Sequence, residues 1–86
     1  MDKPIYCRIG DVFTGIVVNL KPYKHNKTII HVQLDINTNL RFSAIIDCSL
    51  SEALKKYKNQ KVRMKFCGIN NQKKIKWKVD LILFNL

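Results

Sequence analysis

The clearest alternation of hydrophobic and polar positions lies in the middle of the chain. In "IIHVQLDI" (29–36), every second residue from Ile30 onward is apolar, and a period of two is typical of a half-buried β-strand. The same alternation returns in "LRFSAII" (40–46) after the turn-forming "NTN". These residues are therefore predicted to form an antiparallel hairpin, with His31 and Arg41 on its outward face.

The N-terminal part of the chain predicts one long, bent strand. "GDVFTGIVVNL" (10–20) is rich in β-branched and apolar residues and contains Gly15, and a glycine inside a strand favours a bulge or a bend. Phe13 and Val17 share one face of this strand, so they are expected either in the core or in an apolar spot for a partner. The polar, proline-containing "KPYKHNKT" (21–28) predicts a loop.

A short helix is predicted after the hairpin. "DCSLSEALKKYKN" (47–59) starts with the capping residues Asp and Ser, has Glu52 early and carries its lysines late, a distribution that suits the helix dipole. Its apolar residues recur at helical spacing, and Tyr57 is expected to cover the sheet from the helix.

Two further strands are predicted near the C-terminal end, joined by an asparagine-rich turn. Inward positions of the first are Val62, Met64 and Phe66, and those of the second are Ile75, Trp77, Val79, Leu81 and Leu83. Trp77 is expected inside, because its neighbours of the same parity are aliphatic. The outward side chains are almost all cationic: Arg63, Lys65, Lys74, Lys76 and Lys78.

Three strands, a short helix and two strands follow the chain order of the OB-fold, a five-stranded Greek-key barrel whose helix lies between strands three and four. A long first strand bent at a glycine suits that fold, because this strand must pair on both sides of the barrel. The prediction is an all-β, OB-type barrel in one domain, 1–86, with a generic five-stranded roll or an SH3-like barrel as the alternative.

The charge of the chain is strongly positive and unevenly distributed. The net charge is +10, and the stretch from Ala53 to Val79 holds ten basic residues and no acidic one. So much like charge costs self-repulsion unless a polyanion relieves it. Nucleic acid is favoured over an anionic membrane or an acidic protein, because a membrane surface is more often met by an amphipathic helix.

Two stretches resemble a known family. "GDVFTGIVVNL" is similar to the opening of the ribosomal S-one type RNA-binding domain, a branch of the OB-fold, through Gly10, Asp11, Gly15 and Val17. "KNQKVRMKFCGINNQKKI" resembles the fourth strand and following turn of that branch. The resemblance implies an RNA-binding module. The chain differs in the middle, where His31, Arg41 and Ser43 stand near the positions at which that family places aromatic residues, and small single-stranded-DNA-binding or primosomal accessory proteins are equally compatible.

The expected binding surface combines a phosphate track with a loop that stacks bases. In an OB barrel the third strand lies beside the fifth and the fifth beside the fourth, so the outward cations would form one continuous patch. The loop 21–28 and the turn 69–74 would close the groove, with Tyr23 as a stacking platform, while His31 is either a base contact or simply a polar strand residue. The predicted nucleic-acid-binding residues are Lys21, Tyr23, Lys24, Lys27, His31, Arg41, Arg63, Lys65, Lys73, Lys74, Lys76 and Lys78.

These features predict a non-catalytic protein that binds single-stranded nucleic acid, DNA rather than RNA, in replication or repair. The six acidic residues are scattered and form no catalytic pattern. The alternative is a small accessory subunit of a polymerase, primase or helicase. It rests on the apolar end "DLILFNL", in which Ile82, Phe84 and Leu86 are candidate partner-binding residues.

Metal, cofactor and membrane binding are not expected. Cys7, Cys48 and Cys67 are widely spaced and are interpreted as ordinary thiols, with no metal site. No apolar run approaches the roughly 20 residues of a membrane span, and the first ten residues do not resemble a signal peptide. The chain is therefore expected to be a soluble, cytoplasmic protein without a cofactor or a small-molecule substrate.

Overall fold

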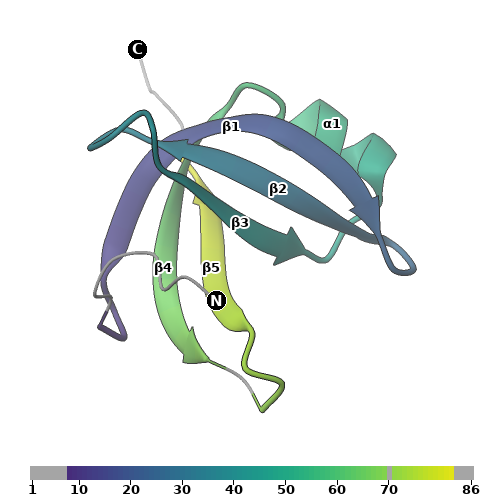
Figure 1. Cartoon of the computed structure of the whole chain (residues 1–86). Helices are drawn as coiled ribbons and strands as arrows, with labels where there is room; N and C mark the ends of the chain where they lie inside the picture. The colour runs from purple at the N-terminus through teal and green to yellow at the C-terminus, as the bar shows by residue number, and fades with distance from the viewer. Residues whose placement is uncertain (1–7, 70, 83–86) are drawn as a thin grey trace.

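Five antiparallel strands and one helix make up the part of the chain that the computed structural model describes, residues 8–69 and 71–82. The order along the chain is β1 (Val12–Tyr23), β2 (Lys27–Leu34), β3 (Arg41–Ile46), α1 (Leu50–Tyr57), β4 (Lys61–Ile69) and β5 (Ile75–Leu81). The sheet order is β3-β2-β1-β4-β5, and β1 arches over the molecule to join the β2–β3 side to the β4–β5 side (Figure 1). The five predicted strands and the position of the helix between β3 and β4 are confirmed.

Gly15 lies where β1 is shared between its two neighbours. It pairs with Leu34 of β2 and with Val62 of β4. A Cβ atom at this position would lie 2.3 Å from the backbone oxygen of Gln33 and 2.7 Å from a side-chain carbon of Val32. Only glycine allows β2 to approach so closely. The bulge expected at Gly15 lies elsewhere, because the register of β1 against β2 shifts between Val17 and Asn19.

The predicted closed barrel is wrong. Among the described residues β3 and β5 are the two edges of the sheet and share no hydrogen-bonded ladder. Contact across the seam between them is made by side chains: the rings of Phe42 and Trp77 stack with centroids 5.0 Å apart. Phe13 meets both rings edge to face. An aromatic cluster therefore fills the seam where a closed barrel has a backbone ladder.

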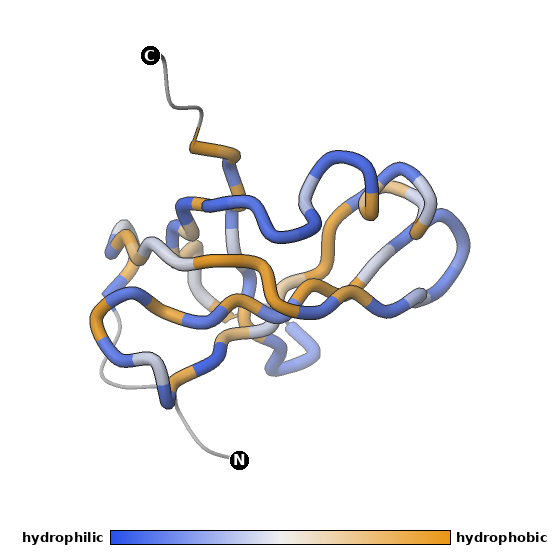
Figure 2. Tube along the Cα trace, turned by 90° about the horizontal axis from the view of Figure 1, so that it is seen from above, coloured by the Kyte–Doolittle hydropathy of each residue, from blue (hydrophilic) through white to orange (hydrophobic). Residues whose placement is uncertain are grey.

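The core follows the alternation of the sequence, as Figure 2 shows along the strands. Phe13 and Val17 belong to the core side of β1, and Trp77 packs against the same core as predicted. Ile36 departs from its pattern and is 70% exposed, because β2 ends before it at Leu34. The buried apolar side chains of the sheet are Val17, Ile30, Val32, Leu34, Phe42, Ala44, Ile46, Val62, Met64 and Phe66.

The helix covers one side of the sheet through Ala53 and Tyr57, which are buried. Its N-cap is Ser49, whose hydroxyl accepts a hydrogen bond from the Glu52 backbone N–H at 3.4 Å. No helix in the described ranges is long and apolar enough to cross a membrane.

Residues 21–28 are mostly strand, which corrects the predicted loop. β1 continues to Tyr23 and β2 begins at Lys27, so a tight turn at 24–26 connects them. Pro22 pairs with Thr28 of β2, whereas β4 pairs only with the first part of β1. One edge of β1 is thus free at Pro22, and a residue without an N–H is tolerated there.

Candidate nucleic-acid interface

The outer face of β2 and β3 consists of three cross-strand pairs. Ile29 lies opposite Ile45, followed by His31 opposite Ser43 and then Gln33 opposite Arg41. Their neighbours in the two strands point into the core, so these six side chains share the other face. One end of that face is aliphatic and the rest is polar.

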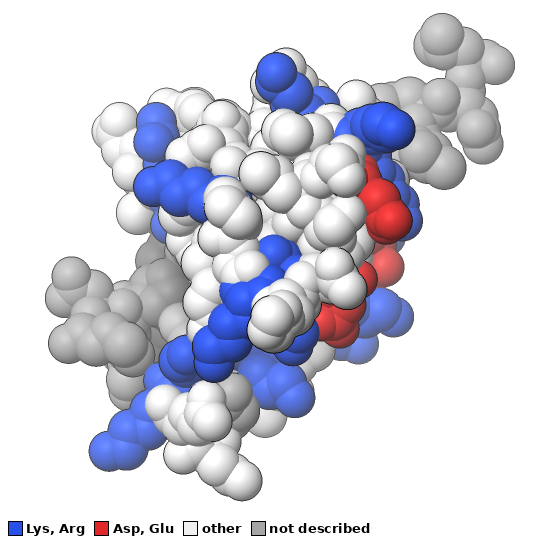
Figure 3. All heavy atoms as spheres, turned by 90° about the vertical axis from the view of Figure 1, so that its right-hand side faces the viewer, with Lys and Arg blue, Asp and Glu red and all other residues white. Residues whose placement is uncertain are grey.

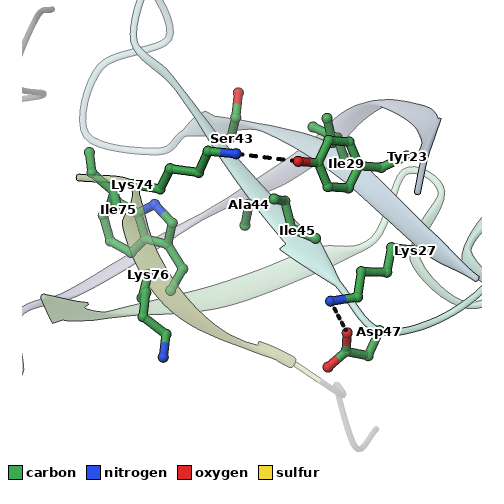
Figure 4. Close-up of a pocket in the computed structure, with 11 residues that line it drawn as sticks. Tyr23, Lys27, Ile29, Ser43, Ala44, Ile45, Asp47, Lys74, Ile75 and Lys76 are labelled. Carbon is green, nitrogen blue, oxygen red and sulfur yellow. Dashed lines mark hydrogen bonds and ion pairs between the residues drawn. The ribbon is translucent and has the colours of Figure 1, made fainter. Parts of the chain in front are cut away.

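An open groove of about 640 Å³ lies between the aliphatic end of this face and the start of β5. Lys27 and Tyr23 line it at the β1–β2 hairpin, and Lys74 and Lys76 line it from the β5 side. In Figure 4, Ile45 lies between these two sides. The seam that lacks a backbone ladder is therefore also the place where cations from two distant segments meet.

Tyr23 and Lys74 approach each other across this groove (Figure 4). The Lys74 ammonium donates a hydrogen bond to the Tyr23 hydroxyl at 3.4 Å. The ammonium groups of Lys24 and Lys74 lie 5.6 and 6.0 Å from the centre of the tyrosine ring. The hydrogen bond from Lys74 and the charges of Lys24 and Lys74 lower the pKa of Tyr23 from its usual 10.0.

Replacing Lys74 should raise the pKa of Tyr23. The Lys74→Gln variant loses the positive charge that favours the tyrosinate form, so the phenol should titrate closer to its usual pKa of 10.0. NMR titration of the tyrosine Cζ signal measures this shift. Lys55→Gln, on the exposed side of α1, makes the same charge change and should leave the Tyr23 pKa where it is; equal shifts in both variants would show that only net charge matters.

His31 contributes hydrogen bonding rather than charge. Its Nδ1 lies 2.9 Å from the Ser43 hydroxyl, and partial burial together with Lys21 and Arg41 lowers its pKa below 6.5. These surroundings disfavour the charged imidazolium form. The structure is compatible with both expectations for His31, a base contact and a polar strand residue.

Two lysines are paired with carboxylates. Lys27 lies 3.5 Å from Asp47 within the groove, and Lys61 lies 2.8 Å from Asp35. Asp35 also accepts a hydrogen bond from Thr14, and these two contacts lower its pKa. Part of the charge of Lys27 is thus neutralised by a carboxylate that the sequence did not associate with the site.

The outer side of β4 and β5 forms a second, mainly cationic surface, the β4–β5 basic face, made of Arg63, Lys65, Lys76 and Lys78. Asp80 shares this face and lies directly opposite Arg63. Lys65 lies directly opposite Lys78, and like charges in that position repel. A register shift between Phe66 and Gly68 places Lys76 opposite Gly68 instead. Because Lys76 also lines the groove, β5 connects the groove to this face.

Figure 3 shows basic side chains in an oblique band across one side of the molecule, with acidic side chains gathered beside it. Arg41 shares its face with the groove but does not line it. Lys21 pairs with Ile29 beside the groove, and Lys73 is exposed in the turn before β5 with a φ of 60°. The single patch predicted from sequence is thus distributed over a groove and two faces.

The site predicted from sequence did not include the three isoleucines of the groove, Ile29, Ile45 and Ile75. Ile29 and Ile45 occupy outward positions of strands that alternate in polarity, and an apolar residue at such a position is the signal that could have identified them. Among the candidate partner residues, Ile82 is half-buried and its N–H donates to the Lys61 carbonyl at 2.9 Å. Phe84 and Leu86 lie outside the described residues.

The described thiols and carboxylates form no metal-binding group. Cys48 is half-buried and Cys67 is exposed, both as free thiols, and burial raises the pKa of Cys48. Within residues 8–69 and 71–82, no three His, Cys, Asp or Glu side chains lie together as metal ligands would. Cys7 lies outside the described part of the chain.

Comparison of the chain with protein-family models, with curated proteins and with solved structures found no match.

Proposed function

We propose that this chain binds single-stranded nucleic acid, DNA in preference to RNA, without catalysing a reaction, in replication or repair. The observation that carries the proposal is the groove, where Lys27, Lys74 and Lys76 converge around a tyrosine and an aliphatic floor. Cations that hold phosphates and apolar or flat side chains that receive bases are the two requirements for binding a single strand.

The strand arrangement supports the same proposal. The sheet order β3-β2-β1-β4-β5, with a helix between β3 and β4, is that of an OB-type barrel whose β3–β5 seam lacks its ladder. OB-folds bind oligonucleotides on the β2–β3 side, between the β1–β2 and β4–β5 connections. In this chain the groove lies there, with Tyr23 at one connection and Lys74 at the other.

The β4–β5 basic face extends the proposed site as a phosphate track. Lys76 and Lys78 are two residues apart on β5 and so lie on one side of it, about 6.6–6.8 Å along the strand. A single-stranded nucleic acid that leaves the groove at Lys76 would reach Lys78 and Lys65 next. Phosphate contacts at this face would bind nucleic acids of any base sequence with similar affinity.

Single-stranded oligonucleotides should bind more tightly than duplexes, because the groove accepts unpaired bases. If four or five phosphates are neutralised, the plot of log K against log salt should have a slope of about −3 to −3.5, from about −0.7 per phosphate. Fluorescence of Trp77, the one tryptophan of the chain, reports on the groove that it lines. Equal or tighter duplex binding, or a slope near zero, would contradict the proposal.

The accessory-subunit function is the second candidate. It is favoured by exposed aliphatic side chains on the outer side of β1, namely Val12, Ile16 and Val18. Exposed apolar residues in a group mark surfaces that bind other proteins. The two functions are compatible, because Val12, Ile16 and Val18 do not line the groove.

A further inference from the structure

The strongest unexplained feature of the groove is its aliphatic floor. Ile29 and Ile45 face each other across β2 and β3 on the outward side, and Ile45 is 43% exposed. The next pairs on that face, His31 with Ser43 and Gln33 with Arg41, are polar. The pair thus places one exposed and one half-buried isoleucine on an otherwise polar face. A ligand that covers the exposed apolar surface with apolar atoms gains stability.

The charge around this floor restricts the occupant. Lys74 and Lys76 line the groove on the β5 side, and Lys24 lies beside Tyr23 at the hairpin. Asp47 also lines the groove but is paired with Lys27, so the charge around the isoleucines stays positive on balance. An anionic occupant that also carries an apolar group complements both the lysines and the isoleucines.

Among nucleic-acid bases, thymine carries an apolar group on its edge, the C5-methyl, and aliphatic side chains contact it favourably. Uracil has the same hydrogen-bonding edge without the methyl. We propose that the Ile29–Ile45 pair is a seat for the thymine methyl, so that the groove selects thymine-bearing single-stranded DNA over uracil-bearing strands. This inference rests on the proposed function and names the ligand class of the same groove.

Aromatic stacking would not produce this preference. Tyr23 offers a ring to any base, and stacking is tolerant of sequence. The 2′-hydroxyl and the methyl both differ between natural DNA and RNA, so comparing those two polymers would not isolate the isoleucines. Oligodeoxyuridylate solves this problem, because it differs from oligothymidylate only by the methyl.

The test compares oligothymidylate with oligodeoxyuridylate of about eight nucleotides, within the roughly 4–16 nucleotides that such folds cover. Each methyl that is seated should improve binding about fourfold, the equivalent of about 0.8 kcal/mol. Ile45→Thr keeps the β-branched shape but replaces a methylene-bearing branch with a hydroxyl, and it should remove most of this preference. Val12→Thr, on the outer side of β1 and outside the groove, is the matched control and should keep it.

The outcomes separate the two proposals. Wild-type protein that binds both oligonucleotides equally well overturns the thymine seat and leaves single-strand binding standing. A preference that survives in Ile45→Thr also overturns it, because the methyl then rests elsewhere. Wild-type protein that binds neither oligonucleotide, with unchanged Trp77 fluorescence, overturns the proposed function and the thymine seat together.

Discussion

The Lys76→Glu, Lys78→Glu double variant should bind single-stranded oligonucleotides roughly a hundredfold more weakly than the wild type. A hydrogen bond to a charged group contributes about 1.5–3 kcal/mol, and the loss of two at the lower value amounts to about 3 kcal/mol. The salt slope should become shallower by about 1.4, for two phosphates at about 0.7 each. Filter binding or fluorescence titration at three salt concentrations measures both effects.

The fold should survive this double charge reversal. Both lysines are exposed, whereas Trp77 and Val79 between and beside them pack against the core. Lys78 faces Lys65 across the strands, so a glutamate there replaces repulsion with attraction. Lys55→Glu with Lys56→Glu on α1 makes the same change in net charge away from the groove and should bind nearly as the wild type does. If the β5 variant also binds normally, the basic face is only solvated surface and the accessory-subunit function becomes the leading candidate.

Replacing Gly15 with alanine should destabilise the protein by roughly 3 kcal/mol, at the upper end of what overpacking usually costs. The new Cβ would lie 2.3 Å from a backbone oxygen of β2, so the strand itself must move. Small domains have about 5–15 kcal/mol of stability, and the loss should appear as a clear drop in the midpoint of urea unfolding.

Gly10→Ala is the matched control for this effect. Gly10 has a φ of 97°, but apart from its chain neighbours no atom of the described residues lies within 4 Å of a Cβ placed there. Its replacement costs only backbone strain, about 1–3 kcal/mol, and should not alter how β1 pairs with β2. Equal amide protection of β2 in the wild type and Gly15→Ala would contradict the close approach of the two strands.

Much of the fold could be predicted because apolar and polar residues alternate along the strands, and this alternation indicates which side chains are buried. The inward positions of β2, β3 and β4 follow directly from a period of two, and the charge distribution of 47–59 identifies the helix. The predictions that were wrong concern how segments distant in the sequence lie relative to one another. Pro22 fits inside β1 only because β4 does not reach that far along the strand, and the sequence holds no local sign of this.

The exposed cationic residues of the candidate site could be predicted from the sequence, but the shape of the groove could not. A lysine on an outward strand position is exposed wherever the strand lies, so Lys65, Lys76 and Lys78 could be identified at once. The groove depends on how closely β3 approaches β5, and that approach is set by the packing of Phe42 against Trp77. Ile29 and Ile45 line a groove only because the two edges are brought together.

Among the described strands, β5 has an unpaired edge, which has a consequence for the behaviour of the protein in concentrated solution. An edge strand offers backbone N–H and C=O groups to any other chain, and lysines along an edge are a common protection against such pairing. Lys76 and Lys78 lie on that strand. A polyanion that neutralises them would remove this protection while it holds several copies of the protein close together. The same lysines that would attract a nucleic acid are therefore expected to oppose edge-to-edge pairing of free protein molecules. A bound nucleic acid would then have to cover the β5 edge itself to prevent such pairing.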